Sequence, residues 1–230
     1  MLKKTLFYLF FIYFLSSFAQ FDTRKVFKDK DYIYYFSINS LKRKYKPNSK
    51  KNYYWFGNGI IHVNKYGYSG QLLDGVYEKK TINNYVLIEK GKFSKGLKDG
   101  FWKKWDMEGN LTEIIKWSKG YKQGEYKLFN NGHLFIKGFY KHNKKQGHWK
   151  YYSKEGFLIK VISWRKDQKN GIYLEYKNGK VIKNGHYKND NKEGKWLEKN
   201  EINYYKNGKI ITRKKRNFLN KILNVFKKVI

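Results

Sequence analysis

The chain has 230 residues, no cysteine, one proline and a formal net charge of +33, from 51 Lys and Arg against 18 Asp and Glu. The lack of cysteine excludes cysteine-ligated zinc, iron–sulfur clusters, thiol nucleophiles and disulfides. Aromatic residues make up 20% of the chain, which indicates ordered structure despite the charge. Two interpretations of the charge stay open: attraction to polyanions, or solubility and A/T-rich codon usage, which favours Lys, Asn, Ile, Tyr and Phe.

Residues 1–19 are predicted to be a secretory signal peptide. Two lysines precede an apolar run over residues 6–15, and a small-x-small site allows cleavage between Ala19 and Gln20. The run is shorter than the roughly 20 apolar residues of a transmembrane helix, although an uncleaved anchor is the alternative. The mature chain is therefore expected in the periplasm, on the outer surface or in the medium. Export argues against a nucleic acid partner.

Residues 20–51 carry no repeat and are interpreted as an N-terminal segment and linker. Aromatic and β-branched residues over 32–36 predict a strand. The lysine-rich stretch 42–51, which contains Pro47, is typical of a linker.

Residues 52–212 are periodic, and this is the most informative feature of the sequence. A glycine recurs every 23 to 25 residues, and a Trp or Tyr stands two positions after each glycine. The glycines are Gly75, Gly100, Gly124, Gly147, Gly171 and Gly194. The aromatic residues that follow them are Tyr77, Trp102, Tyr126, Trp149, Tyr173 and Trp196.

The four central copies continue with a glycine-containing turn, an aliphatic residue and a further aromatic residue. These later aromatic residues are Trp117, Tyr140, Trp164 and Tyr187. Three positions beyond each of them stands a residue that tolerates positive φ, namely Gly120, Asn143, Asp167 and Asp190. Less regular copies flank the central four, one of them around residues 54–68. Atypical terminal copies are expected at the ends of a repeat array.

Each copy is predicted to be a β-hairpin. Asn-Gly between two short aromatic and β-branched runs is the strongest local hairpin signal, as at Asn131-Gly132. In the strand after this turn, residues 134, 136, 138 and 140 share one face and residues 135, 137, 139 and 141 share the other, which predicts that one set lies against a core. The predicted fold is therefore all-β, an elongated antiparallel meander of about six to seven tandem hairpins. We expect the recurring rings to form the core; the alternative is exposed rings, flanked by lysines, that stack on sugars or bases. Each leading glycine is expected to let a ring of the next hairpin lie against bare backbone.

This pattern resembles the MORN repeat, over about residues 52–210, and is most similar to a bacterial variant in proteins named as antitoxins. The carrying residues are the Gly-x-Trp/Tyr triplets, the glycine turns, the aliphatic residue and the later aromatic residue. The resemblance implies a twisted single sheet of hairpins that acts as a scaffold. It also implies binding of proteins or acidic phospholipids rather than chemistry.

No residue constellation predicts catalysis or metal binding. The five histidines are not spaced as metal ligands, and the carboxylates are scattered over predicted turns and strand ends. There is no nucleophile elbow, P-loop or dinucleotide fingerprint. We therefore expect a protein that is not an enzyme, with no metal, no cofactor and no small-molecule substrate.

Lysines recur between the rings, and alternation along a strand places many of them on the solvent face. They are Lys103, Lys116, Lys127, Lys150, Lys160, Lys177, Lys183 and Lys195. Such a row is either a solvated surface or a site that binds anionic polymer in a salt-dependent way.

Residues 213–230 are predicted to be a short basic amphipathic helix. Apolar residues recur there at helical spacing, with lysines opposite. The basic residues that could contact a membrane or an anion are Arg213, Lys214, Lys215, Arg216, Lys221, Lys227 and Lys228. The helix could lie on an anionic membrane or, as we favour, cover the open end of the sheet.

The leading functional hypothesis is an exported, non-enzymatic repeat scaffold that binds a protein partner or the cell envelope. The first alternative is an adhesive protein that binds anionic lipid or glycan through its lysines and the C-terminal helix. The second is an antitoxin-like protein that neutralises a toxin by direct binding.

Overall fold

The computed structural model describes residues 24–39, 45–198 and 201–211, and every regular element in this part of the chain is a β-strand. The strand predicted at 32–36 is confirmed as β2 (Tyr32–Ile38). The predicted signal peptide, with its cleavage site at Ala19 and Gln20, and the predicted helix over 213–230 lie outside the described residues.

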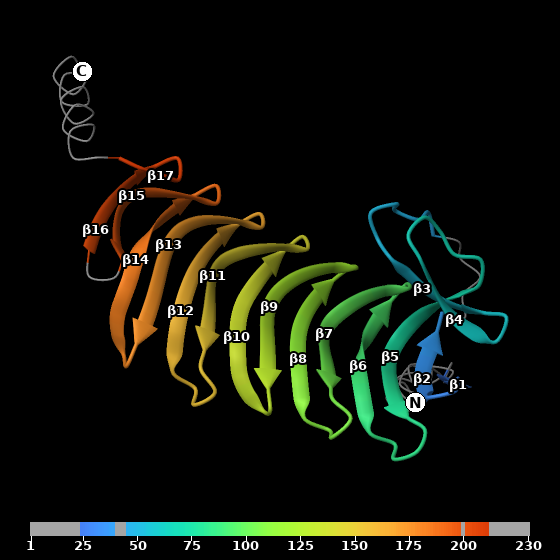
Figure 1. Cartoon of the computed structure of the whole chain (residues 1–230). Coiled ribbons are helices and arrows are strands. Elements are labelled where there is room, and N and C mark those ends of the chain that lie inside the picture. Colours follow the sequence, from blue (N-terminus) through green and yellow to red (C-terminus); the bar gives the residue numbers. More distant parts are fainter. Residues whose placement is uncertain (1–23, 40–44, 199–200, 212–230) are drawn as a thin grey trace, which may run out of the picture.

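The predicted antiparallel meander of tandem hairpins is confirmed. Seventeen strands of the described residues form one open sheet, and from β5 onward each strand pairs with the next in the chain. Figure 1 shows the result as a long array of curved strands. The remaining strands are β1 (Arg24–Lys28), β3 (Tyr53–Gly57), β4 (Ile60–Asn64), β5 (Gln71–Thr81), β6 (Leu87–Ser94), β7 (Leu97–Trp105), β8 (Leu111–Ser118), β9 (Tyr121–Asn130), β10 (His133–Lys141), β11 (Lys144–Tyr152), β12 (Leu158–Arg165), β13 (Gln168–Lys177), β14 (Lys180–Lys188), β15 (Asn191–Glu198), β16 (Glu201–Lys206) and β17 (Lys209–Ile210).

The first hairpin of the repeat region, β3–β4, forms as predicted but does not stand in line with the later ones. β2 lies beside most of β5, whereas β3 pairs only with the first residues of β5. Leu72 and Leu73 are consecutive in β5, and both are buried, at 4% and 0% exposure. Neighbouring residues of a strand face opposite sides, so this end of the sheet is covered on both. The β3–β4 hairpin lies apart from the main array (Figure 1).

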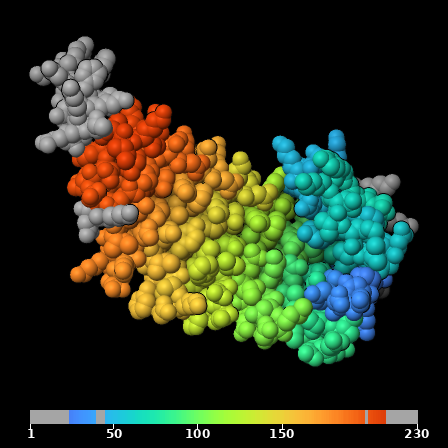
Figure 2. Space-filling view, viewed as in Figure 1, coloured from blue at the N-terminus to red at the C-terminus, as the bar shows by residue number. Residues whose placement is uncertain are grey.

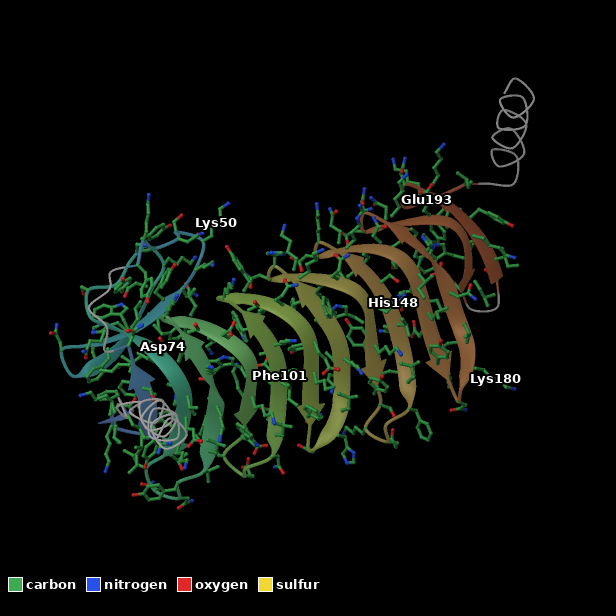
Figure 3. All side chains as sticks on the ribbon, turned by 180° about the vertical axis from the view of Figure 1, so that it is seen from behind. Lys50, Asp74, Phe101, His148, Lys180 and Glu193 are labelled. Atoms are coloured by element: carbon green, nitrogen blue, oxygen red, sulfur yellow. The ribbon has the colours of Figure 1, made fainter. Side chains whose placement is uncertain are left out.

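The turns lie along the two long edges of the sheet, as the labelled positions of Lys180 and Glu193 show (Figure 3). Asn131 and Gly132 have φ values of 48° and 76°, which confirms the turn predicted there. At the other edge His142 and Asn143 have φ values of 51° and 67°. Positive φ at both central residues is the turn geometry that matches the twist of paired strands.

The turns at this second edge also hold neighbouring hairpins together. Asn143 Oδ1 accepts a hydrogen bond from the backbone N–H of Lys122 at 2.7 Å, and the Asn143 N–H donates to the Lys122 carbonyl at 3.0 Å. The same pair of bonds joins Asp167 to Lys145 and Asp190 to Lys169. Pattern analysis predicted the turn conformation but not these bonds, since they connect residues of successive copies.

Two substitutions at Asn143 are expected to separate its role in the turn conformation from its role as a hydrogen-bond acceptor. Asn143→Gly keeps the turn geometry and removes only the acceptor, which costs about 1 kcal/mol. Asn143→Ala removes the same acceptor but keeps a Cβ in the left-handed region without the polar side chain that makes asparagine tolerant there, so it should cost about 1–2 kcal/mol more than Asn143→Gly. Urea unfolding of both variants measures the difference. Equal losses would mean that conformation plays no part.

Candidate binding surface

Three groups of rings recur along one side of the sheet, which we call the aromatic face. In the middle group the ring centre of Trp149 lies 5.4 Å from that of Tyr126, with an interplanar angle of 30°. It lies 5.2 Å from the ring centre of Tyr140, with an interplanar angle of 88°. The first group, Tyr77, Phe93 and Trp102, and the last, Tyr173, Tyr187 and Trp196, repeat this geometry. The predicted aromatic core is thereby confirmed. The three Trp residues are 47 residues apart, so the structural unit is two hairpins rather than one.

The predicted role of the leading glycines is wrong. The glycines beneath the tryptophan rings are Gly91, Gly138 and Gly185, where an added Cβ would overlap the indoles of Trp102, Trp149 and Trp196. A Cβ on Gly100, Gly147 or Gly194 would meet nothing.

The leading glycines instead serve backbone conformation. They all have positive φ, from 69° at Gly147 to 122° at Gly124. The strand register shifts beside each of them, as it does between Lys137 and Phe139 opposite Gly147. A bulge with positive φ favours glycine.

A row of lysines crosses the aromatic face beside these rings. Each lysine stands opposite an aromatic residue of the preceding strand, as Lys145 does opposite Tyr140. Its Nζ lies 4.4 Å from the ring centre of Trp149 and 4.6 Å from that of Trp164, within the range of a cation–π contact. The five lysines of this row are Lys98, Lys122, Lys145, Lys169 and Lys192, opposite Phe93, Trp117, Tyr140, Trp164 and Tyr187.

This row was not predicted, although the sequence carries a signal for it: a lysine stands two positions before five of the six leading glycines. Of the lysines named from the sequence, Lys103, Lys150 and Lys195 adjoin a buried Trp and are exposed on the opposite face. That face also carries Phe101 and His148, at equivalent positions in successive units (Figure 3).

Only the ends of the lysine row are neutralised by carboxylates. Lys98 Nζ lies 2.8 Å from Glu89, and Lys192 Nζ lies 2.6 Å from Glu198. Lys122, Lys145 and Lys169 form no ion pair with the residues that the structure describes. The middle of the row therefore lacks direct ion pairs, and carboxylates such as Asp167 act on it only at longer range.

The buried indole N–H groups also differ between the ends and the middle of the array. Trp102 and Trp196 each donate to a backbone carbonyl at 3.1 Å. Trp117 and Trp149 have no acceptor among the described residues, whereas Trp164 donates a hydrogen bond to the Tyr151 hydroxyl. Buried donors are nearly always paired, so the middle units hold an excess of donors.

Glu198 is expected to make stability depend on pH. Burial acts to raise its pKa, but hydrogen bonds from Lys183, Lys192 and Tyr205 lower it from 4.5 to about 2. A depressed pKa stabilises the fold above the unfolded value, so this contribution is lost as pH falls from about 5 toward about 2. Glu198→Gln should lower the Tm at neutral pH. The Tm of this variant should also decrease less than that of the wild type as the pH is lowered from about 5 toward about 2, as measured by circular dichroism. Glu108→Gln, in an exposed turn, is the control, and identical profiles for both variants would contradict the expectation.

No group of three His, Cys, Asp or Glu side chains in the described residues could hold a metal ion. No helix in the described ranges is long and apolar enough to cross a membrane. A cavity of about 90 Å³ opens on the aromatic face beside Trp102, but Glu89 and Glu113 line it together with lysines.

These observations define a class: an open, single-layer repeat sheet with one face lined by rings and lysines. A scan against models of known protein families finds no match, and a search of curated proteins finds none either. Similarity to MORN repeats thus stays a prediction from the repeat pattern.

Proposed function

We propose that this protein is an exported, non-enzymatic repeat scaffold that binds a protein partner or the cell envelope through the aromatic face. The observation that carries the proposal is the lysine row, whose three middle members lack carboxylate partners. The contacts with neighbouring rings hold these ammonium groups at fixed places on the face. Unpaired cations between half-buried rings suit a partner that supplies anionic groups.

The shape of the protein agrees with this role. The array is elongated and presents a long, continuous surface (Figure 2). Repeat proteins of this kind use such surfaces for binding extended partners.

Export and binding are tested separately. The full chain is expressed in a bacterium with its own residues 1–19, and the N-terminus of the product is determined by mass spectrometry. A product that begins at Gln20 supports export, whereas one that begins at Met1 contradicts it. Binding is tested by co-sedimentation of the purified protein with isolated cell envelopes at low and high salt. Failure to sediment, together with failure to form a complex with any envelope protein, would contradict the proposed function.

The unpaired lysines also favour the second candidate, an adhesive protein for anionic lipid or glycan. In that function the segment 213–230 would take part. Deletion of this segment should then abolish sedimentation with anionic vesicles while the Tm of the sheet stays unchanged. A lower Tm with unchanged sedimentation would instead indicate a lid.

A further inference from the structure

The middle of the lysine row forms a continuous strip across strands β8 to β13, which we call the donor strip. Rings and ammonium groups alternate along it, and each is partly exposed. Cross-strand register places Trp117 opposite Lys122, Tyr140 opposite Lys145 and Trp164 opposite Lys169. Its residues are Trp117, Lys122, Tyr140, Lys145, Trp164 and Lys169.

The donor strip offers hydrogen-bond donors without matching acceptors. Its three ammonium groups are partly exposed and have no ion-pair partner among the described side chains. At either end of the row the lysine forms an ion pair with a carboxylate, Lys98 with Glu89 and Lys192 with Glu198. A ligand of the strip must therefore bring several oxygen acceptors, and charged acceptors give the stronger hydrogen bonds.

The spacing of the donor strip selects among such ligands. Its lysines stand on every second strand, and strands lie about 4.8 Å apart, so successive ammonium groups are about 9.6 Å apart. A ring lies between each pair. The ligand needs an anionic group at a comparable interval and a flat apolar surface between these groups that can stack on Trp or Tyr.

We propose that the donor strip binds a linear acidic polysaccharide, a chain of pyranose sugars that carries carboxylates at regular intervals. The C–H faces of the sugars stack on Trp117, Tyr140 and Trp164. The carboxylates lie against the ammonium groups of Lys122, Lys145 and Lys169. This proposal names the ligand of the binding surface and rests on the proposed function.

Other polyanions fit the strip less well. An extended acidic peptide presents side chains to one face at intervals of about 6.6 Å, which does not match the lysines. Its backbone groups would also find no partners on a face whose own strands are already paired. A lipid bilayer is a plane of headgroups, whereas these lysines are half-buried between rings rather than protruding.

The test is isothermal titration calorimetry of the purified full-chain product with a polygalacturonate oligomer. Lys122→Gln, Lys145→Gln and Lys169→Gln are combined in one variant. The matched control combines Lys103→Gln, Lys150→Gln and Lys195→Gln, which remove the same charge from the opposite face. The donor-strip variant should bind at least about tenfold more weakly, because three charge-assisted contacts are lost. The control should lose less than about threefold, as for exposed charges. Thermal unfolding checks that both variants are folded.

Three further probes decide the chemistry. A neutral glucan oligomer should bind far more weakly than polygalacturonate. Poly-glutamate that binds as tightly as the polyuronate would overturn the polysaccharide and point to an acidic protein, which leaves the proposed function standing. Binding to anionic vesicles alone would overturn the polysaccharide proposal and identify a membrane as the ligand. Equal weakening in the two triple variants would show that only net charge matters. If none of the probes binds, the proposal fails, and envelope co-sedimentation judges the proposed function independently.

Discussion

Trp149→Ala is expected to lower the free energy of unfolding by about 3–5 kcal/mol, the cost of removing a buried aromatic side chain. Trp149 is 2% exposed, covers Gly138 and contacts Tyr126 and Tyr140. In a repeat array each unit contacts only its neighbours, so damage in the middle unit also uncouples the two ends. Urea unfolding followed by circular dichroism should therefore show a lower midpoint and a broader transition.

The matched control for this substitution is Phe101→Ala. Phe101 lies on the opposite face and is 51% exposed, so its truncation should change the free energy of unfolding by less than about 1 kcal/mol. Similar losses for Phe101 and Trp149 would contradict the assignment of the core to the aromatic face.

Gly138→Ala is the second substitution with a large expected effect. An added Cβ would overlap the indole of Trp149, and the ring cannot withdraw because Tyr126 and Tyr140 hold it. Overpacking of this kind costs about 1–3 kcal/mol or more, measured by urea unfolding. Gly67→Ala is the control, because an added Cβ there meets nothing and the backbone is not left-handed.

Substitution by asparagine is expected to distinguish the glycines with positive φ, such as Gly147, from the glycines that lie beneath a Trp ring, such as Gly138. Asn tolerates the left-handed region, so Gly147→Asn should cost less than Gly147→Ala. Gly138→Asn should be at least as damaging as Gly138→Ala, because here the side chain itself does not fit. Equal behaviour of the two glycines would contradict the distinction between ring contact and backbone conformation.

The hairpins could be predicted because their signals are local. Positive φ at Asn131 and Gly132, and the alternation through β10, depend only on neighbouring residues. The two-hairpin unit was also visible, since Tyr and Trp alternate at the positions after the leading glycines. The place of β2 beside β5 could not be predicted. β1 and β2 carry no repeat, and the residues that pair between β2 and β5 are about forty positions apart in the sequence.

The binding surface was only partly predictable for a similar reason. Alternation alone places Lys98 and Trp102 on the same side of β7. Whether a lysine is neutralised, however, depends on the strand beside it. Glu89 pairs with Lys98 from the preceding strand, while the equivalent position beside Lys145 holds Ile136. Such neighbours follow from the register, which shifts at every bulge.

The pairing of each Trp with a glycine restricts how this protein can change in length. Removal of a single hairpin, β9–β10, would bring β8 beside β11 and set Trp149 against Ile115 instead of Gly138. Removal or duplication of two consecutive hairpins, 47 residues, leaves every Trp on its glycine. Gain and loss of repeats should therefore proceed in even steps, so that natural length variants of the array differ by whole pairs of hairpins.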